Sequence, residues 1–198
     1  MNKQEIENIK QKALEEHIPI IMDDTLDVIA KYLKEIEPKR ILEIGTAVGY
    51  SAINFVNELE EDVYVKTIER NDKRYEEAIK NINSIGYSKF IDVVHADATE
   101  YLPNLNEDNS YDVVFIDAAK GQYLKFLENG IRLAKDGAII IADNVLFKGR
   151  VLSDYNEHKH RTAVNRLRSY LEIINSDKRL KSTVMNIGDG IAVSVIKK

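Results

Sequence analysis

The sequence predicts an α/β fold with a mostly parallel, seven-stranded sheet, helices on both faces and an antiparallel hairpin at the C-terminal end. Three observations support this fold class. Short runs rich in Val and Ile alternate with longer segments of helical period. The intervening segments end at glycine, as helices do. The last two apolar runs are separated only by the turn Gly188-Asp189-Gly190, with no helix between them.

The apolar runs predict seven strands, which are, in chain order, RILEI (40–44), VYVKTI (63–68), FIDVV (90–94), YDVVFI (111–116), GAIIIA (137–142), KSTVMNI (181–187) and IAVSVI (191–196). Residues 71–86 and 122–137 place apolar side chains three and four positions apart, so we expect helices there. Strands that alternate with helices form a parallel sheet. The final pair is expected to form an antiparallel hairpin at one edge of this sheet.

Length and composition predict a single domain over residues 1–198. No apolar run approaches the roughly 18 to 20 residues that span a bilayer, so we expect no membrane segment. The N-terminal residues are charged and helix-prone, without the apolar centre of a signal peptide, and the chain has no cysteine. Both features fit a cytoplasmic protein. The formal net charge of -5 argues against a uniformly basic nucleic-acid binder.

The stretch ILEIGTAVGYSAI (41–53) is typical of a strand that enters a glycine turn and then a helix. In an open parallel sheet this first turn is the usual ligand site. A dinucleotide fingerprint from Gly45 needs glycine at 47 and 50, but the chain has Ala47 and Tyr50, so NAD is disfavoured. Glu69 ends the second strand, where a carboxylate can accept both hydroxyls of a ribose, and Glu43 suits a ligand with a cationic part. Alternatively, Gly45 is a turn glycine and Glu69 a solvated strand end.

Polar side chains also follow the fourth and fifth strands. Asp117 ends the fourth strand, and Asp143 and Asn144 end the fifth, so the three should emerge at the same edge of the sheet. Three oxygen ligands without Cys or clustered His predict a hard cation, most simply Mg²⁺. Lys120 follows Asp117 by one helical turn and can reach the same place. The alternatives are turn or helix-capping roles for the acids and a solvated surface position for the lysine.

At these residues the chain resembles the divalent-metal-dependent O-methyltransferases, which include catechol and caffeoyl-coenzyme A O-methyltransferases. The resemblance rests on LEIGTAVGYSA, IER, HADA, FIDAAKGQY and ADNVLFKGRV and covers nearly the whole chain. It implies a Rossmann-like methyltransferase fold, a homodimer, and S-adenosylmethionine as cofactor. It implies cofactor contacts from Ile21, Glu43, Gly45, Ser51, Glu69, Asp97, Ala98 and Asp117. It also implies Mg²⁺, or Mn²⁺, on Asp117, Asp143 and Asn144, with Lys120 as the general base.

Within the family, the motifs are most similar to those of short bacterial members that methylate 5-hydroxyuridine at the tRNA wobble position to 5-methoxyuridine. Residues 145–181 carry nine Lys and Arg against four Asp and Glu, a basic stripe that could steer RNA. We therefore expect tRNA as the acceptor, with small catechol-like or phenylpropanoid compounds as the alternative. The chain is expected to start later than those bacterial members, without their N-terminal helical extension. A non-catalytic nucleotide-binding or RNA-binding module is disfavoured because it needs neither Lys120 nor the oxygen ligands. Phe147 is the best candidate for a pocket wall.

Overall fold

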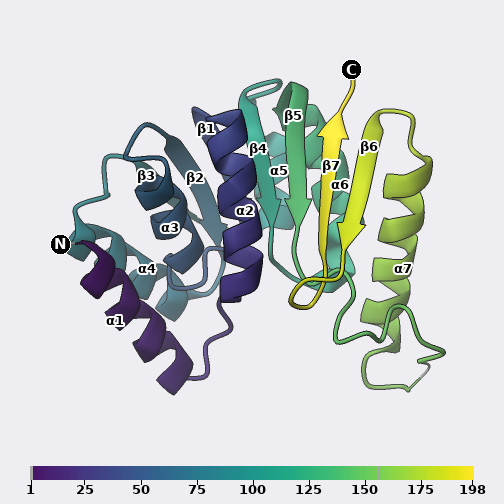
Figure 1. Cartoon of the computed structure of the whole chain (residues 1–198), viewed down its shortest axis with the longest axis horizontal. Coiled ribbons are helices and arrows are strands. Elements are labelled where there is room, and N and C mark those ends of the chain that lie inside the picture. The colour runs from purple at the N-terminus through teal and green to yellow at the C-terminus, as the bar shows by residue number, and fades with distance from the viewer. Residues whose placement is uncertain (1, 156) are drawn as a thin grey trace. The chain divides into compact units, whose positions relative to one another are not determined.

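The computed structural model describes residues 2–155 and 157–198 and divides the chain into two compact units, one that ends at Ala98 and one that spans Thr99–Lys198 (Figure 1). Each unit has its own strands and its own packed helices. The prediction of a single domain over residues 1–198 stays a prediction. Among the described residues, no helix is both long and apolar enough to cross a bilayer.

The first unit contains three parallel strands in the order β3-β2-β1. Its elements are α1 (Asn2–Glu15), α2 (Asp23–Ile36), β1 (Arg40–Ile44), α3 (Tyr50–Glu58), β2 (Tyr64–Glu69), α4 (Asp72–Ile85) and β3 (Ile91–His95), and α5 (Ala98–Asn104) begins at its last residue. The register pairs Glu43 of β1 with Thr67 of β2. Because side chains alternate along a strand, Thr67 and Glu69 point to the same side of the sheet as Glu43.

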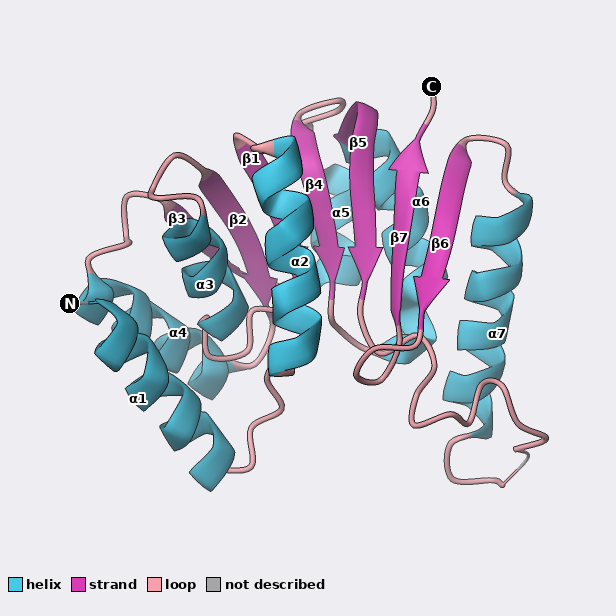
Figure 2. Cartoon of the chain, in the orientation of Figure 1, coloured by secondary structure: helices cyan, strands magenta, loops and turns pink. Residues whose placement is uncertain are grey.

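The helices of the first unit pack on its strands and on one another (Figure 2). Helices α3 and α4 contact the strands, and α1 contacts α3 and α4. Asn71 is the N-cap of helix α4, because its side chain accepts a hydrogen bond from the Arg74 N–H at 3.1 Å, and Gly86, with φ 83°, is the C-cap. The left-handed glycine is the helix end that the sequence pattern of residues 71–86 predicts.

The second unit contains four strands in the order β4-β5-β7-β6. Its elements after α5 are β4 (Tyr111–Ile116), the short 3₁₀ helix η1 (Lys120–Gln122), α6 (Tyr123–Leu133), β5 (Ala134–Ala142), α7 (Arg161–Ser176), β6 (Leu180–Met185) and β7 (Ile191–Ile196). Strands β4 and β5 are parallel, whereas β7 is antiparallel to both β5 and β6. The predicted fold class is confirmed: the described residues hold seven strands, mostly parallel, with an antiparallel C-terminal hairpin.

Helix α6 is held by one apolar stripe, formed by Tyr123, Phe126, Leu127, Gly130, Ile131 and Leu133, all of them buried. These positions lie on one side of the helix, and α6 contacts β4, β5 and α7. The helix ends at Leu133, earlier than the sequence suggested, because Ala134 is extended and already pairs with Tyr111. Gly137, which we interpreted as the end of the helix, is a left-handed residue within β5, with φ 76°.

The turn of the β6–β7 hairpin supports the loop that follows β5. The backbone N–H of Val145 donates to the carbonyl of Gly190, and the N–H of Leu146 donates to the carbonyl of Asp189, both at 2.9 Å. Gly190 has φ 89°, and a Cβ there would lie 2.8 Å from the backbone N of Leu146. The turn therefore needs glycine both for its conformation and for the close approach of the loop.

Candidate active site

The turn after β1 places three residues in the left-handed backbone region: Gly45 has φ 106°, Ala47 φ 47° and Gly49 φ 82°. It is anchored on the next strand, because the N–H groups of Gly45 and Thr46 both donate to the carbonyl of Ile68, at 3.1 and 3.2 Å. The expected glycine turn is present. It has a Cβ at position 47, where the dinucleotide pattern has glycine.

Glu69 holds this turn through its carboxylate. Its Oε2 accepts a hydrogen bond from the Ala47 N–H at 2.9 Å, and its Oε1 accepts one from the Asn71 N–H at 2.8 Å. The residue is only 8% exposed. Each carboxylate oxygen can accept a second hydrogen bond, so both retain capacity for a ribose hydroxyl. Glu69 lies where the prediction requires it, and its contact with the cofactor stays a prediction.

Glu43 is a fully buried carboxylate, with hydroxyl groups on both of its oxygens. Ser51 donates to Oε1, and Thr67 donates to Oε2 at 2.6 Å. The Thr67 hydroxyl also lies 2.6 Å from the hydroxyl of Thr46. A buried negative charge favours a cationic partner, so this arrangement supports the hypothesis that Glu43 faces the cationic part of the ligand.

The remaining cofactor candidates of the first unit lie on two separate segments. Asp97 follows β3 and forms an ion pair with Arg70 at 3.3 Å. Ala98, the first residue of α5, is 9% exposed, and Ile21, just before α2, is 4% exposed. Their predicted roles toward the adenine and the methionine end stay predictions.

In the second unit, the candidate metal ligands follow paired positions of two neighbouring strands. Ile116 of β4 pairs with Ala142 of β5, so Asp117 and Asp143 are the next residues on each strand. The Asp143 N–H donates to the carbonyl of Ile116 at 3.0 Å, which extends the ladder by one bond. Asn144 then turns the chain with a left-handed φ of 56°, and its N–H donates to Asp143 Oδ1 at 2.6 Å. The strand ends bring the two carboxylates together, as predicted.

The electrostatics of this pair favour a cation. Asp143 is 1% exposed, and burial, followed by the charge of Asp117, raises the pKa of its carboxyl to about 7. Burial also raises the pKa of Asp117, while the positive charge of Lys120 opposes this rise. Two carboxylates that cannot both ionise easily at neutral pH become stable as a pair once a cation lies between them.

Lys120 lies beside the third candidate ligand. Its Nζ donates to the side-chain oxygen of Asn144 at 3.0 Å, and it also lies 5.3 Å from the centre of the Phe147 ring. Arg150 lies near the same ring, with its guanidinium carbon 5.0 Å from the ring centre. Phe147, the expected pocket wall, is thus adjacent to the expected base.

Asp117, Asp143 and Asn144 offer only oxygen atoms, which is the donor chemistry that Mg²⁺ and Mn²⁺ prefer. Among the described residues, no group of three His, Cys, Asp or Glu side chains could hold a metal ion. The fit therefore depends on an amide as the third ligand beside two acids. These residues fit a hard divalent cation, and the observation that supports it is that Asp117 and Asp143 follow the paired strand positions Ile116 and Ala142.

Comparisons with a family model and with individual relatives all point to O-methyltransferases. The sequence model of the O-methyltransferases matches residues 4–197, across both units. The chain is 31% identical to a catechol O-methyltransferase of Niastella koreensis over 81% of this chain and 75% of that protein. It is 29% identical to a caffeoyl-CoA O-methyltransferase of Stellaria longipes over 94% and 82% of the two chains. The chain belongs to the O-methyltransferase family.

Solved structures agree. A Staphylococcus aureus protein classed with the caffeoyl-CoA O-methyltransferases is 34% identical, with a TM-score of 0.90 over 96% of this chain and 91% of that one. An O-methyltransferase from Bacillus cereus, solved with S-adenosylhomocysteine, is 25% identical, with a TM-score of 0.85 over 98% and 91% of the chains. The prediction of an S-adenosylmethionine-dependent O-methyltransferase is confirmed. Its metal, acceptor and oligomeric state stay predictions.

Two groups around the sites of this O-methyltransferase were not anticipated. Thr67 supports Glu43, and Tyr123 donates a hydrogen bond to the backbone carbonyl of Asp143 at 2.8 Å. A signal for Thr67 was present, because it sits two residues before Glu69 and so shares its side of the strand. Nothing in the sequence pattern separates Tyr123 from the other apolar positions of its helix.

Proposed function

We propose that this O-methyltransferase transfers the methyl group of S-adenosylmethionine to one of two neighbouring oxygens of a small catechol-like or phenylpropanoid acceptor. The proposal includes a divalent cation on Asp117, Asp143 and Asn144. The observation that carries it is the cluster of two mutually destabilising carboxylates, one amide oxygen and the Lys120 ammonium. The relatives named catechol and caffeoyl-CoA O-methyltransferases support this acceptor class over tRNA.

A divalent cation in this place would supply positive charge that lowers the pKa of a chelated hydroxyl. The two carboxylates and the Asn144 oxygen would fix its position, because their strand ends are tied by the ladder between Ile116 and Asp143. Lys120 Nζ lies 3.0 Å from Asn144 Oδ1, and in its neutral amine form it would receive the proton of the acceptor hydroxyl. Holding the acceptor oxygen in line with the methyl group would supply much of the acceleration.

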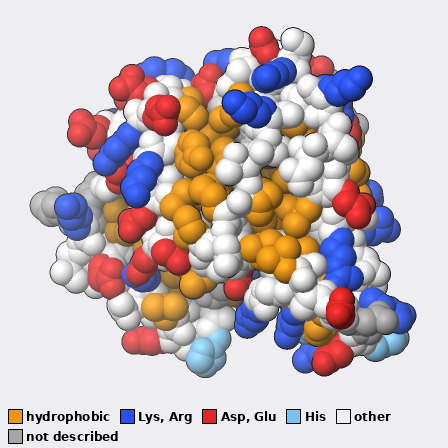
Figure 3. Space-filling view, turned by 45° about the vertical axis from the view of Figure 1, so that its right-hand side comes forward, with side chains coloured by type: hydrophobic (Ala, Val, Ile, Leu, Met, Phe, Trp, Pro, Cys, Tyr) orange, Lys and Arg blue, Asp and Glu red, His pale blue; other side chains and the backbone are white. Residues whose placement is uncertain are grey.

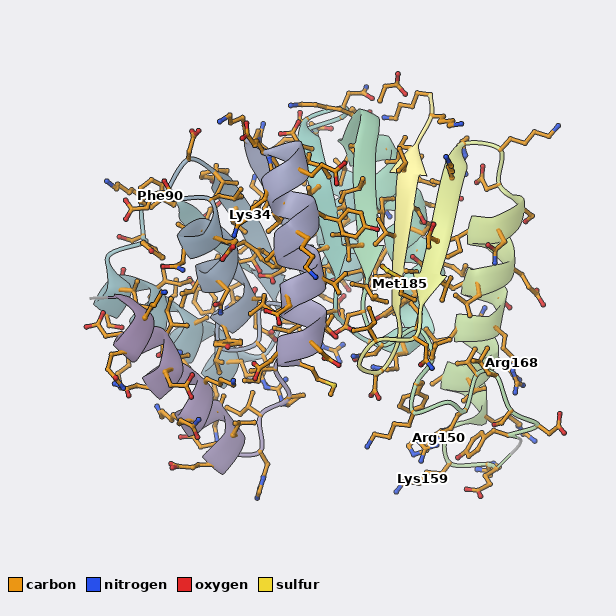
Figure 4. All side chains as sticks on the ribbon, viewed as in Figure 1. Lys34, Phe90, Arg150, Lys159, Arg168 and Met185 are labelled. Atoms are coloured by element: carbon orange, nitrogen blue, oxygen red, sulfur yellow. The ribbon has the colours of Figure 1, made fainter. Side chains whose placement is uncertain are left out.

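The charge distribution favours a second candidate, 5-hydroxyuridine in tRNA, whose 5-hydroxyl lies beside a carbonyl oxygen. Lys and Arg side chains gather at the lower right of Figure 3, and Figure 4 shows Arg150 and Lys159 on the loop between β5 and α7. The Arg150 guanidinium carbon lies 5.0 and 5.2 Å from the ring centres of Phe147 and Tyr155. Among the described residues Arg150 forms no ion pair, so its charge is available to an anionic group such as a phosphate.

The basic stripe is smaller than the sequence count indicated. Arg168 donates to the backbone carbonyls of Val151 at 3.1 Å, Ser153 at 2.5 Å and Arg150 at 3.4 Å, so it holds the loop in place (Figure 4). Arg179 is likewise paired with Asp177 and Glu128. The cations left for RNA are the half-buried Arg150 and six exposed side chains, Lys148, Lys159, Arg161, Arg166, Lys178 and Lys181.

Transfer of labelled methyl groups separates the two acceptors. Purified protein with Mg²⁺ and labelled S-adenosylmethionine would be supplied with catechol, with phenol, or with tRNA that contains 5-hydroxyuridine. We expect label in catechol and none in phenol, since phenol lacks the second oxygen needed for chelation. Equal transfer to phenol would contradict chelation as the basis of recognition, and transfer to tRNA alone would replace the small acceptor with the second candidate.

A charge-reversal pair tests the tRNA candidate directly. Arg161→Glu with Arg166→Glu should sharply reduce transfer to tRNA and leave transfer to catechol unchanged, because phosphate contacts position RNA without touching the reacting atoms. The matched control reverses Lys80 and Lys125, which are exposed and lie on other helices. If the test pair and the control pair have the same effect on transfer to tRNA, the basic stripe does not bind RNA.

A homodimer, implied by the family resemblance, stays part of this proposal.

A further inference from the structure

Tyr123, the first residue of α6, is buried against the candidate metal ligands. It has no exposed surface, and its hydroxyl donates a hydrogen bond to the backbone carbonyl of Asp143 at 2.8 Å. Its ring packs edge-on against Tyr170 of α7, with the ring centres 5.6 Å apart. The phenol is therefore held by packing on one side and by the end of β5 on the other.

The segment that follows β4 carries this hydroxyl. Strand β4 ends at Ile116, just before Asp117, and α6 begins at Tyr123 after the short helix η1. The hydrogen bond from Tyr123 to the Asp143 carbonyl therefore links the segment that follows Asp117 to the end of β5. The contact is to the main chain, so it restrains the position of a strand end and not only the rotation of a side chain.

The hydrogen bond from Tyr123 lies just beyond the last paired residues of β4 and β5. The β4–β5 ladder reaches Ile116 and Ala142, with one further bond from the Asp143 N–H to the Ile116 carbonyl. The chain then turns away at Asn144, with φ 56°. Beyond this point, the Asp143 carbonyl is bound by Tyr123. Two neighbouring acids that repel each other would tend to separate unless their backbones were held.

We propose that Tyr123 is a positioning residue that sets the separation of Asp117 and Asp143, so that both carboxylates can bind one divalent cation. The inference rests on the proposed function in that the cation is part of that proposal. Tyr123 touches neither the cation nor the acceptor. Groups that orient metal ligands in this way typically contribute about 10-fold to 100-fold in metal affinity.

The chain offers a matched control for this proposal. Tyr170 is as deeply buried as Tyr123 and packs against the same ring, but its hydroxyl has no hydrogen-bond partner among the described residues. Tyr123→Phe and Tyr170→Phe each remove a single oxygen atom from the same aromatic pair. A general effect of losing a buried hydroxyl would appear in both variants, and an effect on the cation site would appear only in Tyr123→Phe.

Mn²⁺ binding to the purified, metal-free proteins is measured by electron paramagnetic resonance, together with the thermal unfolding midpoint without metal. We expect Tyr123→Phe to weaken Mn²⁺ binding by roughly 10-fold or more, and Tyr170→Phe to stay within about twofold of the unmodified protein. The Michaelis constant for Mn²⁺ should rise in Tyr123→Phe while that for S-adenosylmethionine is unchanged.

Equal Mn²⁺ affinity in the two variants would overturn the proposal. A Tyr123→Phe protein that does not fold would overturn it too, because the hydroxyl would then serve the fold and not the spacing of the ligands. If the unmodified protein binds no Mn²⁺, the metal of the proposed function fails first, so the two failures are distinguishable.

Discussion

The ammonium of Lys120 donates a hydrogen bond to the side-chain oxygen of Asn144 at 3.0 Å. The expected base therefore occupies an oxygen that the expected cation also needs. A cation on Asp117, Asp143 and Asn144 would repel the ammonium and take over this oxygen, since both are positively charged. Lys120 would then be free to turn toward the acceptor, and it would act as a base once the ammonium has released a proton to solvent. The contact links metal binding to the readiness of the base.

Lys120→Met should lower kcat by roughly 10²-fold to 10⁴-fold, the usual contribution of a positioned general base. The affinity for S-adenosylmethionine should not change, because Lys120 lies on η1, whereas the cofactor candidates Glu43 and Glu69 lie on β1 and β2. Steady-state kinetics and calorimetry measure the two quantities. The control is Lys125→Met, which replaces an exposed lysine in the first turn of α6. A Lys120→Met enzyme with unchanged kcat would remove this residue from the chemistry.

The raised pKa of Asp143 should make the stability of the metal-free protein depend on pH. Burial and the charge of Asp117 raise the pKa of this carboxyl from 3.8 to about 7. Between these values the folded protein retains a proton that the unfolded chain has released, so stability falls as the pH rises through this window. Above the window the carboxylate is ionised and ready for a metal, so stabilisation by Mn²⁺ should increase from about pH 6 to about pH 8.

Thermal unfolding between about pH 5 and pH 8, with and without Mn²⁺, checks both trends. Asp143→Asn removes the titrating group and keeps the shape of the side chain, so its stability should depend less on pH over this window. If the unmodified protein and Asp143→Asn have the same pH profile, the pKa of Asp143 is not raised in the folded state.

Glu69→Ala should weaken S-adenosylmethionine binding by about 1 to 3 kcal/mol, because it leaves the ribose hydroxyls unpaired and frees the Ala47 and Asn71 N–H groups. Calorimetric titration gives the affinity. Asp92→Ala removes an exposed acid from the neighbouring strand β3 and should have no effect. Equal affinities in the two variants would exclude Glu69 from the cofactor site.

Gly190→Ala should destabilise the protein more than Gly137→Ala. Both glycines have left-handed φ, at 89° and 76°, so each substitution introduces backbone strain of about 1 to 2 kcal/mol. At Gly137 a Cβ meets nothing within 4 Å, whereas at Gly190 it lies 2.8 Å from the backbone N of Leu146 and also overlaps its side chain.

Overpacking of this kind typically adds about 1 to 3 kcal/mol, and urea unfolding of the two variants measures the difference. The displaced loop should also reduce kcat in Gly190→Ala, because it carries Asn144 and Phe147. Equal stability of the two variants would show that the loop moves away without cost.

Much of the fold and the acidic cluster followed from the sequence because both depend on short-range patterns. Asp117 and Asp143 were predicted together because the carboxyl ends of neighbouring parallel strands meet at one edge. The predicted start of β5 at Gly137 is wrong, because the strand begins at Ala134. The pattern favoured a helix up to Gly137, but the amphipathic stripe of α6 stops at Leu133. A glycine signals a left-handed residue without specifying which element contains it.

Contacts between distant segments could not be predicted in this way. The count of basic residues treated Arg168 as a free charge, but its guanidinium binds carbonyls 15 to 18 residues earlier in the chain. Tyr123 similarly fits the apolar stripe of α6, and only the fold reveals that its hydroxyl reaches the carbonyl of Asp143. Side chains that act through the backbone of another element leave no periodic signal in the sequence.

The most direct measurement of metal-assisted methyl transfer follows labelled methyl from S-adenosylmethionine to catechol in the presence of excess chelator, and again after Mg²⁺ or Mn²⁺ is restored. Because Asp117, Asp143 and Asn144 offer only oxygen ligands, we expect transfer to stop with the chelator and to return with either cation. Asp143→Ala should stay inactive after the metal is restored, while still binding S-adenosylmethionine. Full transfer in excess chelator, or in Asp143→Ala, would contradict a metal site at these strand ends.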